Sequence, residues 1–329
     1  MRSRAYMVGV SLYRDHPVRR GIETSSIIWR SGSTALRDFA PSSGGMPVLI
    51  IPSLVNRFTI LDLQPDHSFV KFLAQSGFRP LVVDWDSPQE SEKNFSLEDY
   101  VSQRLKPALD IAANGGKVHV IGYCMGGNLA LALSALVPEK VKSLSLLATP
   151  WDFSAGCEAS GLDGSTLERC LRLWEPGNDY LPVEAVQSVF TAFQPLHAYR
   201  KFSAFSAYDQ SSLEAARFVL TEDWLNDGVP LTIPAARESF GDWYARNVTM
   251  RNDWTICGSK INPKEVMLAS FVVVPVNDRI VPPQSSEPLA HMLPHSTCLM
   301  PAMGHIGIMA SPKACDMVWK PLVSWLMEQ

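Results

Sequence analysis

A cysteine lies within Val-Ile-Gly-Tyr-Cys-Met-Gly-Gly (residues 120–127), where many enzymes place a nucleophilic serine. Gly122, Cys124 and Gly126 fit the pattern G-x-[S/C]-x-G. The apolar stretch before the pattern predicts a strand, and the Ala- and Leu-rich stretch after it predicts a helix. Glycines flank such a nucleophile because larger side chains would clash with the strand and the helix. We therefore predict that Cys124 is a nucleophile on a strand-to-helix turn.

A nucleophilic thiol needs a base, and the base needs a group that orients it. His305 follows a short predicted strand at 296–301, and Asp278 ends an apolar strand predicted at 270–278. The chain order of nucleophile, acid and histidine is that of the α/β-hydrolase enzymes. We predict His305 as the base and Asp278 as its orienter, with Asp84 and Asp86 as alternative acids.

The other histidines fit the role of base less well. His119 lies within the strand that precedes Cys124, His291 on a predicted helix and His295 in a turn. We expect the remaining three at the surface or at helix caps, namely His16, His67 and His197.

Two backbone amides are expected to bind an oxyanion during acyl transfer. One is the N–H of Met125, at the N-terminus of the predicted helix. The other should come from the loop after the strand at 47–52, and we assign it to Leu54 or Val55. Backbone amides carry no sequence signature, so this assignment follows from position only.

Strands and helices alternate along most of the chain, which predicts an α/β-hydrolase fold with a mostly parallel central sheet. Residues 1–46 are expected to form a basic N-terminal arm and a β-hairpin, and residues 47–329 the catalytic domain. A helical cap insertion is predicted at about 151–257, where the alternation stops. The predicted elements of the catalytic domain are strands at 47–52, 79–85, 117–123, 141–148, 270–278 and 296–301, and helices at 66–76, 96–113 (disturbed at Pro107), 125–136, 285–293 and 311–327.

Composition narrows the classes of function. The 329 residues carry a net charge of -4, so nucleic acid is not an expected partner. The six cysteines contain no C-x-x-C pair, and no metal site is expected. No apolar run reaches the roughly 18 residues of a membrane span, and we expect a cytoplasmic protein with reduced thiols.

Several motifs together resemble the polyhydroxyalkanoate synthase family. They are GYCMGG, the segment at 51–88 with its Asn-Arg-Phe and Leu-Asp-Leu-Gln-Pro groups, VNDRIVPP at 276–283 and GHIGI at 304–308. The resemblance spans residues 25–327 and is least clear at 160–235. It implies an acyltransferase that polymerises (R)-3-hydroxyacyl-CoA with release of CoA and needs no cofactor.

The resemblance also implies roles for the predicted residues. Cys124 would hold the growing chain as a thioester, and His305 would take the thiol proton. Asp278 would orient His305 or help to activate the 3-hydroxyl group of the incoming unit. Hydrolysis by the same residues, as a thioesterase or polyhydroxyalkanoate depolymerase, is the alternative function.

Partners follow from the same resemblance. Only about 46 residues precede the first predicted core strand, as in short catalytic subunits of two-subunit synthases. The expected partners are therefore the hydroxyacyl-CoA, the polymer chain, a second synthase subunit or a second copy of the chain, and the surface of a polymer granule.

Overall fold

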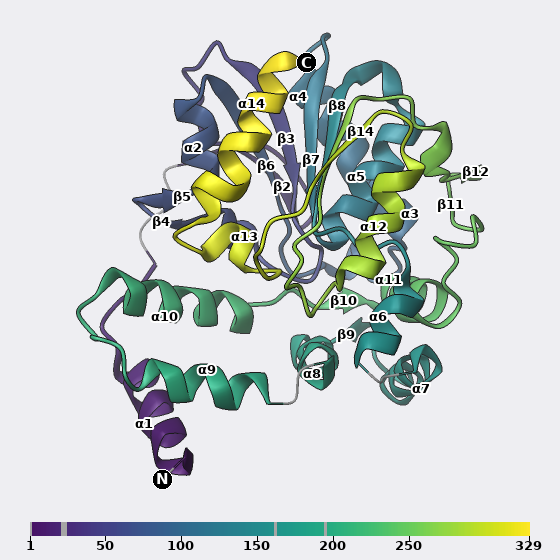
Figure 1. The fold of residues 1–329 in the computed structure, drawn as a ribbon. Coiled ribbons are helices and arrows are strands. Elements are labelled where there is room, and N and C mark those ends of the chain that lie inside the picture. Colours follow the sequence, from purple (N-terminus) through teal and green to yellow (C-terminus); the bar gives the residue numbers. More distant parts are fainter. Residues whose placement is uncertain (1, 21–24, 161–162, 194–195) are drawn as a thin grey trace.

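An eight-stranded sheet runs through the centre of the protein (Figure 1). The computed structural model describes residues 2–20, 25–160, 163–193 and 196–329. In spatial order the strands are β1 (Ser26–Ser31), β2 (Thr34–Asp38), β6 (Phe78–Asp84), β3 (Met46–Ile51), β7 (Val118–Tyr123), β8 (Val141–Leu147), β13 (Ser270–Val273) and β14 (Ser296–Leu299). The six strands from β6 to β14 are parallel, and β1 and β2 join as an antiparallel hairpin. This is the α/β-hydrolase fold that the alternating pattern predicts.

Helices cover both faces of the sheet, because its central strands are apolar on both sides. One apolar layer packs α2 (Phe69–Gln75), α13 (Gly307–Ala310) and α14 (Lys320–Glu328) against the sheet. The other layer packs α3 (Leu97–Tyr100), α4 (Lys106–Ala113), α5 (Met125–Leu136) and α12 (Pro283–Met292). The two layers hold the sheet rigidly, so that the loops at its carboxyl edge have a fixed support.

Most predicted elements are confirmed, and the differences have local causes. The helix expected from residue 66 begins only at Phe69, because Ser68 caps it and a small hairpin precedes it. The strand expected to run to residue 278 ends at Val273, shortly before Pro275, which has no N–H to donate. Two π-helical segments lie directly before Lys-Pro pairs, η3 (Val101–Leu105) and η7 (Cys315–Trp319).

A helical cap lies at the lower edge of the sheet in Figure 1. Its helices are α6 (Phe153–Ser160), α7 (Gly164–Trp174), α8 (Val183–Phe193), α9 (His197–Phe205), α10 (Leu213–Asn226), α11 (Ile233–Ala236) and the π-helical η5 (Arg237–Ala245). The large aromatic side chains at its base are buried, and they include Trp151, Trp224, Trp243 and Trp254. Their burial anchors the cap to the body of the protein.

The N-terminal helix α1 (Arg2–Asp15) packs along α9 of the cap (Figure 1). The ring of Tyr6 stacks on Tyr199 with 5.4 Å between centroids, and the hydroxyl of Tyr13 donates to Asp223 at 2.7 Å. The basic N-terminal segment is therefore a helix bound to the cap.

The remaining elements are short. They are η1 (Phe58–Leu61), β4 (Asp62–Gln64), β5 (His67–Ser68), η2 (Glu90–Glu92), η4 (Pro138–Lys140), β9 (Tyr180–Leu181), β10 (Leu231–Thr232), β11 (Thr255–Ile256), β12 (Ser259–Lys260) and η6 (Pro263–Glu265). Within the described ranges, no helix combines the length and the apolar character needed to cross a membrane.

Candidate active site

Cys124 occupies a strained turn between β7 and α5. Its backbone has φ 54° and ψ -129°, a conformation that costs a non-glycine residue roughly 1–3 kcal/mol. The turn is held because the Cys124 N–H donates to the Leu147 carbonyl at 2.9 Å and the Cys124 carbonyl accepts from Gly127 at 2.8 Å. A Cβ atom on Gly126 would lie 2.2 Å from the Ile51 carbonyl oxygen, so only glycine fits there. The glycines of the motif therefore allow the turn that presents the thiol.

Asp278 and His305 meet beside this thiol, on the loops after β13 and β14. Asp278 Oδ2 lies 2.6 Å from His305 Nδ1, and both side chains are buried. The other carboxylate oxygen of Asp278 accepts from the N–H groups of Ile280 and Val281, each at 2.8 Å. Since Nδ1 faces Asp278, Nε2 is the ring nitrogen left to act on Cys124, whose charge and side chain raise the pKa of His305. The structure thus brings the three residues together in the predicted order.

Charge pairing determines the protonation of His305. Burial disfavours the imidazolium, but the charges of Asp278 and Cys124 and hydrogen bonds to both side chains raise the pKa of His305 well above its usual value. This direction matches an imidazolium that forms when the histidine takes the thiol proton.

Tyr123 positions the histidine, a role that the sequence did not reveal. Its ring stacks on the His305 ring with 5.4 Å between centroids, and its hydroxyl donates to the His305 carbonyl at 3.1 Å. Burial raises the pKa of Tyr123 far above its usual value, so the hydroxyl stays a neutral donor. The only available signal was an aromatic residue directly before the nucleophile.

The alternative acids are bound to arginines. Asp84 accepts from Arg37 at 2.6 Å, and Asp86 accepts from Arg57 at 2.7 Å. Among the described residues, no cluster of three or more His, Cys, Asp or Glu side chains could hold a metal ion.

For two histidines the expectation of a surface position was wrong. His16 and His67 are buried, and neither lies at the surface. His67 Nε2 lies 2.7 Å from the Met309 carbonyl, and His16 Nε2 lies 3.0 Å from the Gln210 carbonyl. Each ring is thus satisfied by a backbone oxygen from a distant part of the chain, which no local pattern indicates. His119 is buried in β7, as expected, 2.7 Å from Ser143 Oγ.

The loop assigned to the oxyanion site is held by the cap. The Val229 N–H donates to the Val55 carbonyl at 2.9 Å, and Trp224 Nε1 donates to the Arg57 carbonyl at 2.7 Å. Val55 lines the cavity above Cys124, whereas Leu54 packs into the core. Met125 is the first residue of α5, where amides lack partners within the helix. The part of the loop around Val55 therefore lines the same cavity as the thiol and is hydrogen-bonded to the cap.

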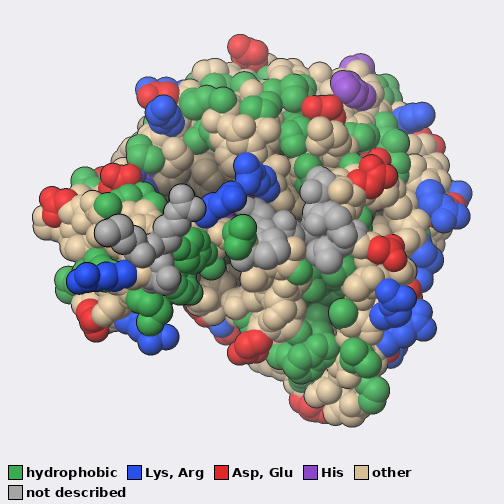
Figure 2. Space-filling model, turned by 60° about the horizontal axis from the view of Figure 1, so that its bottom comes forward, with side chains coloured by type: hydrophobic (Ala, Val, Ile, Leu, Met, Phe, Trp, Pro, Cys, Tyr) green, Lys and Arg blue, Asp and Glu red, His purple; other side chains and the backbone are tan. Residues whose placement is uncertain are grey.

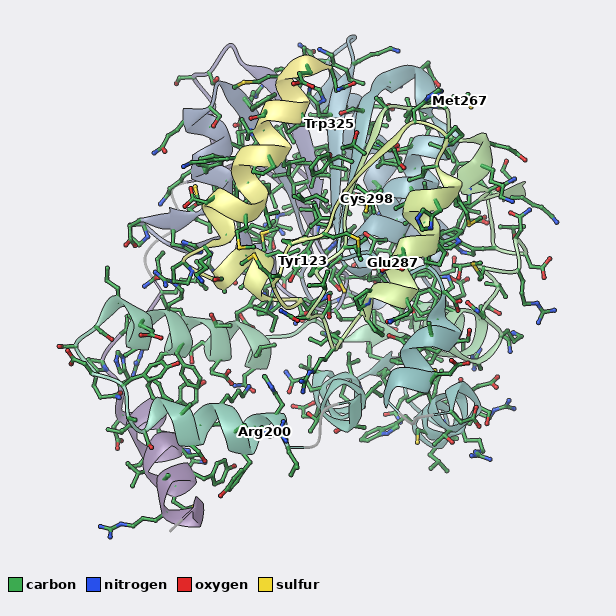
Figure 3. The ribbon with its side chains drawn as sticks, viewed as in Figure 1. Tyr123, Arg200, Met267, Glu287, Cys298 and Trp325 are labelled. Carbon is green, nitrogen blue, oxygen red and sulfur yellow. The ribbon has the colours of Figure 1, made fainter. Side chains whose placement is uncertain are left out.

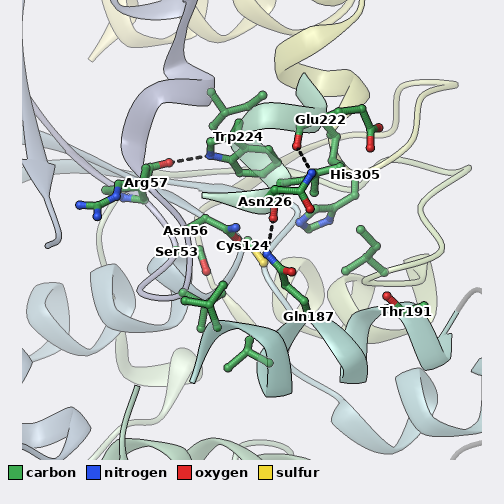
Figure 4. A pocket seen from close by; sticks show the side chains of 18 of the residues that line it. Ser53, Asn56, Arg57, Cys124, Gln187, Thr191, Glu222, Trp224, Asn226 and His305 are labelled. Atoms are coloured by element: carbon green, nitrogen blue, oxygen red, sulfur yellow. Dashed lines mark hydrogen bonds between the residues drawn. The ribbon is translucent and has the colours of Figure 1, made fainter. Parts of the chain in front are cut away.

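A cavity of about 200 Å³ lies between the cap and the strand ends (Figure 4). Cys124 and His305 open into it from the body of the protein. Its apolar lining comes from both layers and includes Val55, Ile60, Val183, Val186, Trp224 and Leu225. Such a cavity can enclose a short acyl group at the thiol and limit the access of water.

The cap contributes a buried ion pair to the cavity wall. Lys201 Nζ of α9 lies 2.6 Å from Glu222 Oε2 of α10, and Glu222 is 7% exposed. Burial raises the pKa of Glu222 even beside the lysine. Sequence reasoning missed both residues, because the cap shows no regular pattern that would place α9 beside α10.

Comparison with known proteins agrees with the fold. The family described as alpha/beta hydrolase fold matches residues 46–312. The chain belongs to the alpha/beta hydrolase fold family. Two solved members share this fold at low identity, a carboxylesterase of Nitrososphaera gargenis and an esterase of Thermogutta terrifontis, each with a TM-score of 0.56. They are 14% and 17% identical and cover 91% and 93% of this chain, which spans 98% and 99% of theirs.

Within this hydrolase-fold family, the chain is similar to proteins named poly(3-hydroxyalkanoate) polymerase subunit PhaC. The protein of Haloferax mediterranei is 27% identical over 86% of this chain, and that of Allochromatium vinosum 28% identical over 88%. The chain spans 83% of the Allochromatium protein. It spans only 59% of the Haloferax protein and 61% of the Haloarcula marismortui relative.

Proposed function

We propose that the protein is an acyltransferase of the polyhydroxyalkanoate synthase type. The observation that carries the proposal is a Cys124 thiol on a strand-to-helix turn, in one cap-covered and largely apolar cavity with a His305 that is paired to Asp278. The names of the similar polymerase subunits point to the same chemistry. The substrate would be a 3-hydroxyacyl-CoA, with no further cofactor.

The first step loads the enzyme. His305 Nε2 takes the proton of the Cys124 thiol, and the resulting thiolate attacks the carbonyl carbon of the CoA thioester. The backbone amides of Met125 and Val55 would donate to the oxyanion. CoA leaves with the proton from His305, and the acyl group remains on Cys124 as a thioester. Asp278 fixes the ring and stabilises the imidazolium throughout.

The second step transfers the acyl group. The 3-hydroxyl group of an acyl unit gives its proton to His305 and attacks the thioester, which forms an ester and releases the thiolate of Cys124. A thioester keeps the activation of the CoA bond, whereas a serine ester would lose much of it before chain growth. The cysteine therefore favours transfer over hydrolysis.

Partners and location belong to the same proposal. We place the protein in the cytoplasm, at the surface of polymer granules, and acting with a second copy or a second subunit. The exposed apolar side chains of α1, Met7 and Val8, offer a surface for such contacts beside the cap.

The test is incubation of purified protein with (R)-3-hydroxybutyryl-CoA, alone and with a candidate second subunit. CoA release and the size of the product are followed together. We expect CoA release together with the formation of an oligomer or polymer. Release of free 3-hydroxybutyrate with no oligomer in either condition would identify a hydrolase instead.

A further inference from the structure

Positive charge collects at one side of the cavity. His197, Arg200 and Lys201 lie on the first turns of α9, and Arg279 directly follows Asp278. Figure 3 labels Arg200 on the end of α9 that lies nearer α8. Figure 2 turns the cap side toward the reader and shows Lys and Arg side chains beside a hollow near its centre.

These basic side chains are close enough to act on one another. Burial lowers the pKa of His197, and the charges of three neighbours lower it further, namely Lys201, Arg279 and Arg200. His197 and Lys201 also line the cavity that contains Cys124. The cluster is therefore continuous with the candidate active site.

Little negative charge offsets this cluster. Glu222 pairs with Lys201, but Arg200 and Arg279 are exposed and form no ion pair with any described residue. By contrast, Arg57, an arginine that lines the cavity itself, is bound by two carboxylates, Asp86 and Asp227. Arg200 and Arg279 thus stay without a carboxylate partner among the described residues, and the amides at the start of α9 add partial positive charge.

We propose that Arg200 and Arg279, with His197 and Lys201 behind them, bind the phosphate groups of an acyl-CoA. The inference rests on the proposed function, because that function brings the CoA thioester to Cys124. Guanidinium groups bind phosphate through paired hydrogen bonds, and two unpaired arginines on separate elements can grip a carrier that bears several phosphates. The site would hold the phosphates of CoA at the entrance of the cavity while the acyl group enters it.

Binding of free CoA tests the site without any need for turnover. Calorimetry compares CoA with pantetheine, which lacks the phosphates, for the wild type and for Arg200→Gln with Arg279→Gln. The matched control is Lys260→Gln on the exposed hairpin strand β12, far from α9 in Figure 1. We expect the double variant to bind CoA roughly tenfold or more weakly, pantetheine to bind equally to all three proteins, and salt to weaken CoA binding to the wild type.

Steady-state kinetics with two thioesters distinguishes an effect on phosphate binding from an effect on the acyl-transfer reaction. For an active enzyme, the double variant should raise KM for 3-hydroxybutyryl-CoA but leave kcat/KM for the N-acetylcysteamine thioester unchanged. An equal loss for both thioesters, or CoA binding unaffected by the substitutions, would overturn the phosphate site and leave the proposed acyl transfer standing. CoA binding that depends on the arginines, without CoA release or product, would support the site and refute the acyl transfer.

Discussion

The N–H of Val229, in the cap, donates to the carbonyl of Val55, in the loop beside the nucleophile, at 2.9 Å. An isolated antiparallel β-bridge pairs Asn56, which follows Val55, with Gly228, which precedes Val229. We propose Val55 as an oxyanion donor, and on that proposal the position of the cap would set the position of the donor. Substitutions in this cap segment should therefore affect the rate of acyl transfer.

Gly228→Ala should lower kcat for CoA release by roughly tenfold, since oxyanion donors need accurate placement. A Cβ atom there would lie 2.6 Å from Val183 Cγ1 of α8 and 3.2 Å from the Val55 oxygen, so the Val183 side chain must move and the Val55 carbonyl must shift by a few tenths of an ångström. KM should change less than kcat. The control is Gly44→Ala, where a Cβ meets nothing within 4 Å. Equal kcat values for the two variants would refute the coupling.

The pair of His305 and Asp278 predicts a particular dependence of stability on pH. The pKa of His305 is raised in the folded protein, so between its usual value of about 6.5 and the raised value the folded state binds more protons than the unfolded state. The stability that His305 adds should be fully present below pH 6.5 and should be lost as the pH rises through the raised pKa. Urea unfolding of wild type and His305→Gln from pH 6 to 9 measures this difference. A difference that grows with pH would contradict the pairing.

Breaking the ion pair between Lys201 and Glu222 should destabilise the folded protein, because it leaves a largely buried charge without a partner. Glu222→Gln leaves Lys201 without its partner and should lower the free energy of unfolding by about 3 kcal/mol. Replacing both residues, with Lys201→Met and Glu222→Leu, should recover most of that loss.

An exposed pair with the same 2.6 Å separation, Lys320 and Asp316, provides the control. Asp316→Asn should cost less than about 1 kcal/mol. Urea denaturation of all four proteins measures the effects, and similar losses for Glu222→Gln and Asp316→Asn would show that the cap pair is not buried in solution.

The sequence predicted the parts of the site that depend on local motifs. Cys124, Asp278 and His305 each follow a strand of the parallel sheet, and the carboxyl ends of parallel strands lie at one edge of the sheet. The glycines around Cys124 have a steric cause that can be read directly from the chain. For these reasons the fold and the grouping of the three side chains could be anticipated.

The features that the sequence did not predict depend on contacts between distant segments of the chain. Three such contacts have no periodic pattern in the sequence that would predict them. They are the packing of α1 on α9, the hydrogen bond from Val229 to Val55 and the ion pair of Lys201 with Glu222. The burial of His16 and His67 has the same cause, since each ring meets a backbone oxygen far along the chain. These contacts depend on where the cap lies on the sheet, and the hydrophobic pattern of the sequence does not predict that position.

The most direct test of the central claim is the mass of the intact protein after brief mixing with 3-hydroxybutyryl-CoA. The account predicts a covalent adduct of one or more 3-hydroxyacyl units, found by peptide mapping on Cys124 and released by hydroxylamine. Cys124→Ala should show no adduct and should release CoA at least roughly 10⁴-fold more slowly. CoA release by Cys124→Ala at the wild-type rate, or an adduct on another residue, would contradict the account.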